Sequence, residues 1–386
     1  MKLSLGELSL ERGGTVLVAQ ALGAAPAGAE IELVGSDPEL AGQLAAWCRP
    51  RGLRCDGLRV TAAPDPRWTG ALASGHPDPT VPGAVAAVAD PRWGLAARGA
   101  VVEDGAPELS FALSTRDEIW DDDAPRLYAA AVAAQWDPAT VPWDAPRSTD
   151  PAVEAAVVQV MTYLVENEAA ALLVPARFLP TIHPHYREVV AFLATQIADE
   201  ARHIEVFTRR ASMGGAVGRS GRGGQASLAT LVREPEWPLA SFLLSVMGEA
   251  SFLELLRFLA DVAPDPITAT VARLAAQDEA RHVAFAVGHL RRACERDPDL
   301  RHRLAAAAAG RERALQQTAG LTEATFDALV VLAAGGLDPV RIGAGFDRVV
   351  DLGRRMDRAR RGHLQRLGFD EARAAELSSL HTRNFM

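Results

Sequence analysis

The sequence predicts a mainly α protein with two parts: a small α/β domain over residues 1–118, and a helical domain over residues 119–386 built on a four-helix bundle with extra C-terminal helices. Three observations predict this organisation. An alternating strand followed by an Asp-Pro helix start lies near the N-terminus, and helical periodicity dominates from about residue 122 onward. The pentapeptide Asp-Glu-Ala-Arg-His occurs twice, at residues 199–203 and 278–282, which indicates a duplicated helical unit.

The composition indicates a globular protein of the reducing cytoplasm. Apolar residues make up 48% of the 386 residues and charged residues 23%, which is enough for a large core. The three cysteines, Cys48, Cys55 and Cys294, make no disulfide framework. The N-terminus does not resemble a signal peptide, and no apolar run reaches membrane-spanning length without a charge or a proline. We therefore expect no membrane partner, and the net charge of −9 argues against a nucleic acid as a partner.

The first domain is expected to alternate helices and strands. Residues 30–35 alternate apolar and polar side chains as a strand does, and Asp37-Pro38 directly after them is a helix start. The other elements are more weakly patterned. We expect helices over about residues 15–22 and 38–49, and strands over 30–35, 58–63 and 100–114.

Long helical segments fill the second domain. Their apolar positions recur with helical spacing, and prolines or glycines separate them. We expect these helices over about residues 151–174, 185–211, 239–262 and 266–296, with shorter ones after residue 298. Pro175 is expected to end the first of them. The basic stretch Arg354–Arg361 is expected to be a solvated helix face.

Each pentapeptide places a carboxylate and an imidazole three residues apart, Glu200 with His203 and Glu279 with His282. On a helix this spacing puts both side chains on one face, one turn apart. A carboxylate oxygen and an imidazole nitrogen that point the same way form half of a metal site. Two such halves predict a site for two metal ions, which in a helical bundle takes one further Glu from each of two other helices.

The further carboxylates are chosen by periodicity. Steps of three and four from Glu168 meet only apolar positions, whereas steps from Glu166 meet a more polar stripe. In the third long helix Glu249 lies on the apolar stripe, while Glu254 can pair with Arg257 at the surface. A lone carboxylate in an apolar stripe is costly unless something compensates it. We therefore expect Glu168 and Glu249 to be the ligands.

Charge supports this set. Four carboxylates at −1 each and two divalent ions at +2 each sum to zero, so the buried site is neutral only with two metals. Without metal, the crowded carboxylates would repel one another and take up protons. Carboxylate and imidazole ligands suit iron or manganese, whereas structural zinc would favour thiolates.

The aspartates of the two pentapeptides are expected to support the histidines. A ligating imidazole usually donates its other N–H to a carboxylate, which fixes its tautomer. We expect Asp199 to reach His282 and Asp278 to reach His203. The arginines of the same motifs can pair with these aspartates and keep the buried charges matched: Arg202 and Arg281.

At these residues the chain resembles the ferritin-like diiron carboxylate proteins, which include monooxygenase hydroxylases, acyl-carrier desaturases, the ribonucleotide reductase small subunit and arylamine N-oxygenases. The resemblance covers about residues 125–300 and implies a ferritin-like four-helix bundle with two irons that activate O₂. The ligand roles that it implies fall on both pentapeptides and on the two preceding glutamates: Glu168, Glu200, His203, Glu249, Glu279 and His282.

Two positions depart from branches of this family. The reductase small subunit has a radical-forming tyrosine four residues after the first motif's histidine, and here that position is Phe207. Some N-oxygenases carry an extra histidine one turn before the second motif's glutamate, and here that position is Ala275. Residues 1–60 also resemble small bacterial sulfur-carrier proteins, but they lack the reactive Cys-Pro pair of those proteins.

The expected function is that of a non-haem diiron oxygenase or oxidase that acts on a small organic substrate by hydroxylation, N-oxidation or desaturation. The cofactors are two Fe ions, or a Mn/Fe pair, with O₂ as co-substrate. Because no flavin or iron–sulfur motif is visible, electrons must come from an external ferredoxin or reductase. A homodimer is considered as the assembly. The alternatives are a ferroxidase or iron-handling protein without an organic substrate, and a metal-stabilised scaffold.

Overall fold

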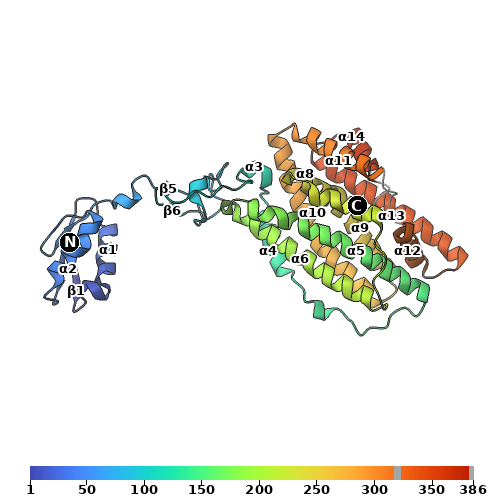
Figure 1. Cartoon of the computed structure of the whole chain (residues 1–386), viewed down its shortest axis with the longest axis horizontal. Helices are drawn as coiled ribbons and strands as arrows, with labels where there is room; N and C mark the ends of the chain where they lie inside the picture. The colour runs from blue at the N-terminus through green and yellow to red at the C-terminus, as the bar shows by residue number, and fades with distance from the viewer. Residues whose placement is uncertain (317–322, 382–386) are drawn as a thin grey trace. The chain divides into compact units, whose positions relative to one another are not determined.

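The computed structural model describes residues 1–316 and 323–381 (Figure 1). Contacts divide the chain into two compact units. One unit comprises Met1–Ala84 with Asp90–Leu109, and the other comprises Val85–Ala89 with Ser110–Met386. The second unit contains the long helices, and all six side chains that the sequence predicts to bind metal lie within it.

The first unit contains a four-stranded sheet with the order β1-β2-β4-β3. Strands β1 and β2 are parallel, because α1 crosses between them, and the other pairs are antiparallel. Buried aliphatic side chains such as Val18, Ile31 and Leu44 form the core between this sheet and its helices. The elements are β1 (Lys2–Gly6), η1 (Leu10–Gly14), α1 (Thr15–Ala24), β2 (Glu30–Gly35), α2 (Leu40–Cys48), η2 (Arg49–Arg51), β3 (Cys55–Asp56) and β4 (Arg59–Thr61).

The rest of this unit is mostly irregular. The short turn η3 (Pro66–Trp68) precedes a two-stranded ribbon of β5 (Leu72–Ala73) and β6 (Val101–Val102), and η4 (Pro91–Trp93) lies in the connection between these two strands. The expected strand over residues 100–114 is therefore wrong beyond its first residues. Gly105 adopts a φ of +76°, which turns the chain, and the proline at position 107 has no N–H to donate to a ladder.

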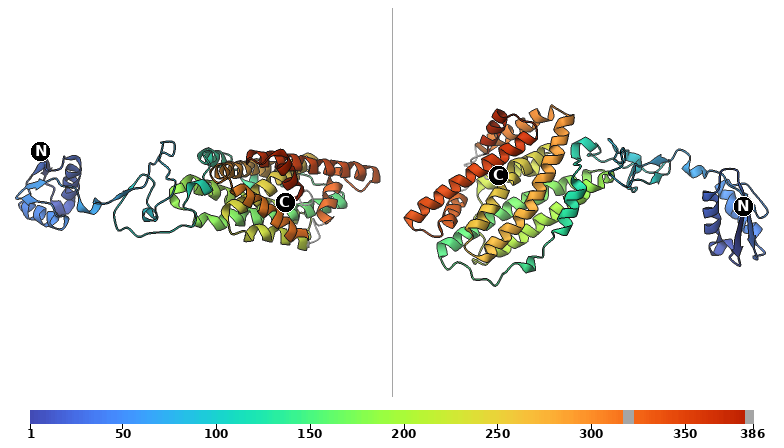
Figure 2. Two further views of the ribbon diagram at one scale, coloured as in Figure 1. Left: turned by 90° about the horizontal axis from the view of Figure 1, so that it is seen from above. Right: turned by 180° about the vertical axis from the view of Figure 1, so that it is seen from behind.

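The second unit is a ferritin-like bundle of four long helical segments (Figures 1 and 2). Asp150 caps α5 by accepting from the N–H of residues 152 and 153, and Asp265 caps α10 by accepting from Thr268. A proline follows each cap at the first helical position. The four segments are α5 (Pro151–Phe178), α6 (Arg187–Ser212), α8–η8–α9 (Trp237–Ser241, Phe242–Glu249, Ala250–Val262) and α10 (Pro266–Arg296).

Two irregularities lie inside these helices. Pro175 does not end α5 as expected but lies within it, and the helix continues to Phe178. Val174 and Phe178 are buried, so packing of this last turn offsets the hydrogen bond that the proline cannot make. In the third segment, η8 is a stretch of π-helix that ends at Glu249. Such stretches are rare and frequently lie at functional sites.

Arg210 ties three of the bundle helices together. Its guanidinium is fully buried and donates to Glu154 of α5 at 2.8 Å and to Asp265, which precedes α10, at 2.7 Å. Both partners are carboxylates, so the buried charge is matched. This contact fixes one end of α6 against its two neighbours.

The remaining helices cover the bundle. They include α13, whose basic stretch was expected to be solvated. That expectation is wrong for Arg360, which is 1% exposed and donates to Ser251 of α9 and Ser378 of α14. The covering elements are α3 (Arg116–Ile119), α4 (Ala124–Ala133), η5 (Pro138–Thr140), η6 (Leu179–Thr181), η7 (Pro184–Tyr186), α7 (Arg222–Arg233), α11 (Leu300–Gln316), α12 (Glu323–Ala334), α13 (Pro339–Arg366) and α14 (Glu371–Ser379).

Two helical stretches are long and apolar enough to cross a membrane by length and composition alone: Pro151–Thr181 and Trp237–Val262. The bent pair Ala324–Ala334 and Pro339–Arg366 would add a third if it formed one span. Of the apolar windows in the first two, 61% and 83% is buried inside the protein. Packing in the bundle core accounts for their apolar character.

Candidate metal centre

The six side chains predicted to bind metal converge inside the bundle. Each is at most 2% exposed. Their ligand atoms form two groups, and within each group these atoms lie within 4.8 Å of one another. The groups share two members, Glu200 and Glu279, which come from the two pentapeptides. The first group is Glu168, Glu200, His203 and Glu279, and the second is Glu200, Glu249, Glu279 and His282.

The choice by helical stripe agrees with the placement of the side chains. Glu168 and Glu249 face the interior at 1% and 2% exposure. Glu166 is only half-buried, and Glu254 pairs with Arg257 at 2.7 Å. A shift of two residues along α5 therefore separates an interior carboxylate from one outside the cluster.

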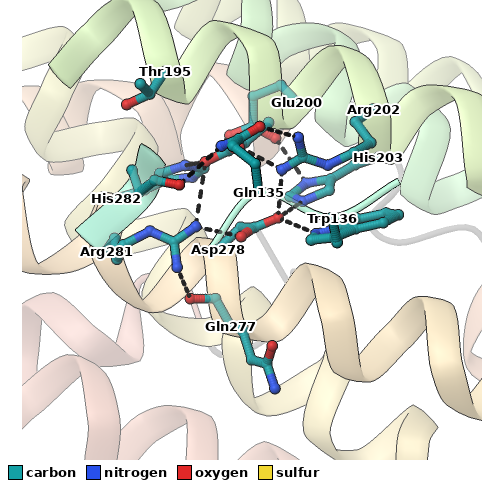
Figure 3. Close-up of polar contacts among 12 residues, drawn as sticks. Gln135, Trp136, Thr195, Glu200, Arg202, His203, Gln277, Asp278, Arg281 and His282 are labelled. Atoms are coloured by element: carbon teal, nitrogen blue, oxygen red, sulfur yellow. Dashed lines mark hydrogen bonds and ion pairs between the residues drawn. The ribbon is translucent and has the colours of Figure 1, made fainter. Parts of the chain in front are cut away.

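Each of the two histidines is oriented by an aspartate of the opposite motif, as Figure 3 shows for His203 and Asp278. His203 Nε2 lies 3.1 Å from Asp278, and His282 Nε2 lies 3.3 Å from Asp199. The Nδ1 atoms consequently turn toward the carboxylates. His203 Nδ1 is 3.2 Å from Glu200, and His282 Nδ1 is 3.0 Å from the same residue. The Nδ1 atoms are thus the ones available to a metal.

Both aspartates lie in a network of cations and neutral donors, in which Figure 3 labels Asp278, Arg202 and Arg281. Arg202 bridges Asp199 and Asp278, with 3.0 Å to the latter, and Arg281 also contacts both. Two neutral donors complete the network. Gln135 donates to Asp199 at 3.0 Å, and the Trp136 indole N–H donates to Asp278 at 2.8 Å. The two buried aspartates are therefore matched by two arginines.

Sequence reasoning missed Gln135 and Trp136. Both follow α4 in an irregular segment, where no periodic pattern relates them to the motifs. The Trp136 ring lies nearly parallel to the His203 ring, with centroids 6.4 Å apart, and the Arg202 guanidinium lies 4.6 Å above the indole. Trp136 is half-buried, so it extends the network from His203 toward the surface.

The pKa shifts of the clustered carboxylates indicate that protein groups alone do not compensate their negative charges. Burial and the neighbouring Glu200 carboxylate raise the pKa of Glu168 well above its usual value. Burial and Glu279 do the same to the pKa of Glu249. Burial would also raise the pKa of Glu200, but hydrogen bonds with Glu168 and both histidines outweigh it and lower that pKa. Crowded carboxylates thus favour proton uptake, as the sequence predicted.

The pKa values of both histidines are raised, although burial alone would lower them. Burial alone would lower the pKa of His203, but the Glu168 carboxylate and the bond to Asp278 raise it well above its usual value. The pKa of His282 is raised in the same way, chiefly by Glu200 and Glu279. The interior therefore attracts positive charge, whether from protons or from metal ions.

Several buried oxygens have no hydrogen-bond partner in the described part of the chain. They include both carboxylate oxygens of Glu249 and of Glu279, and one oxygen each of Glu168 and Glu200. The Nδ1 atom of His282 also has no hydrogen bond of acceptable angle, although a carboxylate lies 3.0 Å away. Unsatisfied buried carboxylates are costly. Oxygen and imidazole donors arranged in two groups fit a pair of iron or manganese ions.

A small cavity lies one helical turn from this cluster. Its volume is about 10 Å³, enough for one water-sized group. Gln196 and Ser245 line it, and each precedes a glutamate of the cluster by four residues. The buried indole of Trp237 also lines it, and its N–H has no hydrogen-bond partner in the described residues. The remaining lining residues are Pro175, Ser241, Leu244, Phe285 and Ala286, so no charged side chain faces the space.

The two departures from family branches are both buried. Phe207 packs 6.2 Å from the His203 ring, where a tyrosine would be needed for radical storage. Ala275 lies one turn before Glu279 and adds no seventh ligand. His289, seven residues after His282, bonds to Ser241 at 2.7 Å instead of joining the cluster.

Comparison with known proteins agrees with this geometry. Residues 153–319 match the family of the p-aminobenzoate N-oxygenase AurF, and this segment contains all six clustered side chains. The departure at Ala275 thus coexists with a match to an N-oxygenase family. No curated protein matches the chain.

Solved structures similar to the chain include two mutants of an R2-like ligand-binding oxidase. One, with an Fe/Fe cofactor, has a TM-score of 0.47 and 16% identity over 64% of this chain and 94% of that chain. The other, with a Mn/Fe cofactor, has a TM-score of 0.47 and 17% identity over the same shares of both chains.

Proposed function

We propose, from the premise that this chain is a ferritin-like diiron oxygenase or oxidase, that it N-oxidises a small organic amine at two metal ions held by Glu168, Glu200, His203, Glu249, Glu279 and His282. The observation that carries the proposal is the sharing of Glu200 and Glu279 between the two buried groups, because two carboxylates common to both groups suit a pair of adjacent cations. The match to an N-oxygenase family favours nitrogen as the site of oxidation.

The bound metal pair would supply the electrons and the Lewis acidity that O₂ activation requires. The chain's own residues hold that pair in place. Asp278 and Asp199 keep the Nε2 atoms of the histidines engaged, so that each Nδ1 faces the carboxylates. Arg202 and Arg281 neutralise the aspartates, which leaves the four glutamates to balance two divalent ions.

The expected stoichiometry requires an electron donor. An amine, O₂, two electrons and two protons give a hydroxylamine and water. We infer that an external ferredoxin or reductase delivers the electrons near Trp136. This half-buried indole is hydrogen-bonded to Asp278, which in turn bonds to His203, so a continuous path of bonded groups leads from the edge of the bundle to the cluster.

The cavity beside the cluster holds one water-sized group, at about 10 Å³. An organic amine is larger than this space, so it would have to displace side chains such as Gln196, Ser245 and Trp237 to approach the metals from that side.

The test combines metal content, O₂ uptake and product analysis on the full chain. We expect about two metals per chain, and O₂ consumption by the reduced protein that yields hydroxylated nitrogen from aniline or 4-aminobenzamide. The Glu249→Gln variant should lose this activity, while the matched Glu254→Gln variant on the same helix should keep it. Iron oxidation and O₂ uptake that no amine alters would instead indicate a ferroxidase, and two bound metals without O₂ uptake would indicate a scaffold.

The assembly is tested separately. Light scattering coupled to size-exclusion chromatography distinguishes the homodimer considered above from a monomer in solution. A mass near 41.0 kDa would mean a monomer and would refute the dimer without touching the proposed chemistry.

A further inference from the structure

The first unit contains a groove that the metal chemistry does not use. Its volume is about 700 Å³, within the range of small-molecule sites. One wall is the outer face of α1, and the other is the C-terminal end of α2 with the segment that follows β4. All its lining residues belong to this unit, so the groove is complete within it.

Apolar side chains line one side of the groove and are unusually exposed. Val16 of α1 is 60% exposed, and Ala19 and Leu22 continue the same wall. Trp68, on the segment after β4, is 46% exposed and faces the same space. A concave surface lined by exposed apolar side chains is typical of a binding site.

The indole of Trp47 and a guanidinium form the opposite side. Trp47 packs against the domain core, and Arg51 lies over its ring at 4.4 Å while donating to the Trp47 carbonyl at 3.0 Å. These two contacts hold Arg51 at the rim of the groove. Planar side chains stacked in this way present a flat surface to a ligand.

The charge of the rim is not balanced. Arg67 forms a two-point ion pair with Asp65, with 2.8 Å to the nearer oxygen, so this pair carries no net charge. Asp65 also interacts with Arg51, although more weakly than with Arg67. Two arginines and one carboxylate leave the rim with a net charge of +1 beside an apolar, partly aromatic wall, which selects an anion with an apolar body.

We propose that this groove binds a small organic anion with a planar apolar body, whose charged group pairs with Arg51 and whose body lies against α1 and Trp68. Binding here is non-covalent. The unit has no cysteine in the groove, and Cys48 is fully buried with its thiol pKa raised to about 12 by burial. The inference does not depend on the proposed N-oxidation.

The test measures binding of 2-naphthoate and its neutral analogue 2-naphthamide to the full chain by calorimetry. We expect one naphthoate site, with affinity that weakens as salt rises, and binding of the amide at least about tenfold weaker. Arg51→Gln should abolish this preference for the anion. Arg54→Gln, an exposed arginine outside the groove, is the matched control and should leave both affinities unchanged.

Two further variants locate the site. Ala19→Trp should fill the groove and remove naphthoate binding, while circular dichroism shows an unchanged fold. Glu249→Gln in the other unit should leave naphthoate binding unchanged. Equal binding of acid and amide, equal losses in Arg51→Gln and Arg54→Gln, or binding that Ala19→Trp does not alter would each overturn the proposal. So would the absence of binding at millimolar naphthoate.

Discussion

Asp278 lies 3.1 Å from His203 although 75 residues separate them, and Asp199 reaches His282 in the same way. Each pentapeptide therefore supplies a carboxylate that orients the imidazole of the other. This reciprocity couples the two halves of the cluster, because displacing one helix would disturb the histidines of both. It also leaves every Nδ1 atom free to face the shared carboxylates.

Replacing Asp278 by Asn tests this coupling. The amide keeps the size of the side chain but removes the charge that holds His203 and matches the arginines. We expect metal affinity about 10- to 100-fold lower, measured by competition with a chromophoric chelator. The exposed Asp261→Asn, on α9, is the control and should behave as wild type. Unchanged affinity in Asp278→Asn would mean that the aspartate only assists folding.

Trp136→Phe tests the proposed electron path. Phenylalanine keeps an aromatic ring but cannot donate to Asp278 and is harder to oxidise. We expect the variant to keep its metals and to react normally after chemical reduction with dithionite, but to be reduced several-fold more slowly by a ferredoxin–reductase pair. Trp143→Phe is the control, because the Trp143 indole donates to the Pro138 carbonyl and not to the cluster. Slower turnover with both reductants would instead indicate damage to the cluster.

The sequence predicted the cluster well because its members obey helical spacing. Glu168 and Glu249 lie in apolar stripes where a carboxylate is costly, so burial could be inferred without coordinates. The same reasoning failed at Pro175, because tertiary packing of the turn after it outweighs the missing hydrogen bond. It also failed at Arg360, whose hydroxyl partners come from two other helices, one of them 109 residues away in sequence.

Residues that reach the site from irregular segments could not be predicted. Trp136 contacts Asp278 across 142 positions of sequence, and no periodicity relates the two. Gln196 and Ser245 line the cavity from helices that were predicted, yet their role depends on a space that only the packing creates. Spacing within one helix is readable from sequence, whereas contacts between an irregular segment and a bundle are not.

Asp121 gives a prediction for stability against pH. It is buried against Gly288, and burial raises its pKa from 3.8 to about 6. Between these two values the folded state binds more protons than the unfolded state, so this carboxyl lowers stability as pH rises from about 4 to 6. The cost stays constant above pH 6. It is absent at lower pH, where both states are protonated.

Asp121→Asn should therefore stabilise the protein. After a discount for partial solvent screening, we expect about 1–2 kcal/mol at pH 7.5, and about half of that or less at pH 4.5. Urea unfolding at the two pH values measures the difference at equal metal content. The exposed Asp144→Asn is the control and should change little at either pH. A gain that is the same at both pH values would show that the effect is not due to ionisation of Asp121.

Glu249→Gln should have opposite effects on the stability of the metal-free protein and on metal binding. Both oxygens of Glu249 are buried without hydrogen-bond partners in the described residues, and burial next to Glu279 disfavours its charge. In the metal-free protein a neutral amide relieves that cost, so we expect the thermal midpoint of the variant to equal or exceed that of wild type. Metal binding should change in the opposite direction, because the second group loses one of its four candidate ligands. The stoichiometry should fall from about two ions per chain to about one. Glu254→Gln, five residues away on the same helix and paired with Arg257, should retain both ions. A Glu249→Gln protein that still binds two metals with wild-type affinity would remove Glu249 from the ligand set and leave the second group with three members.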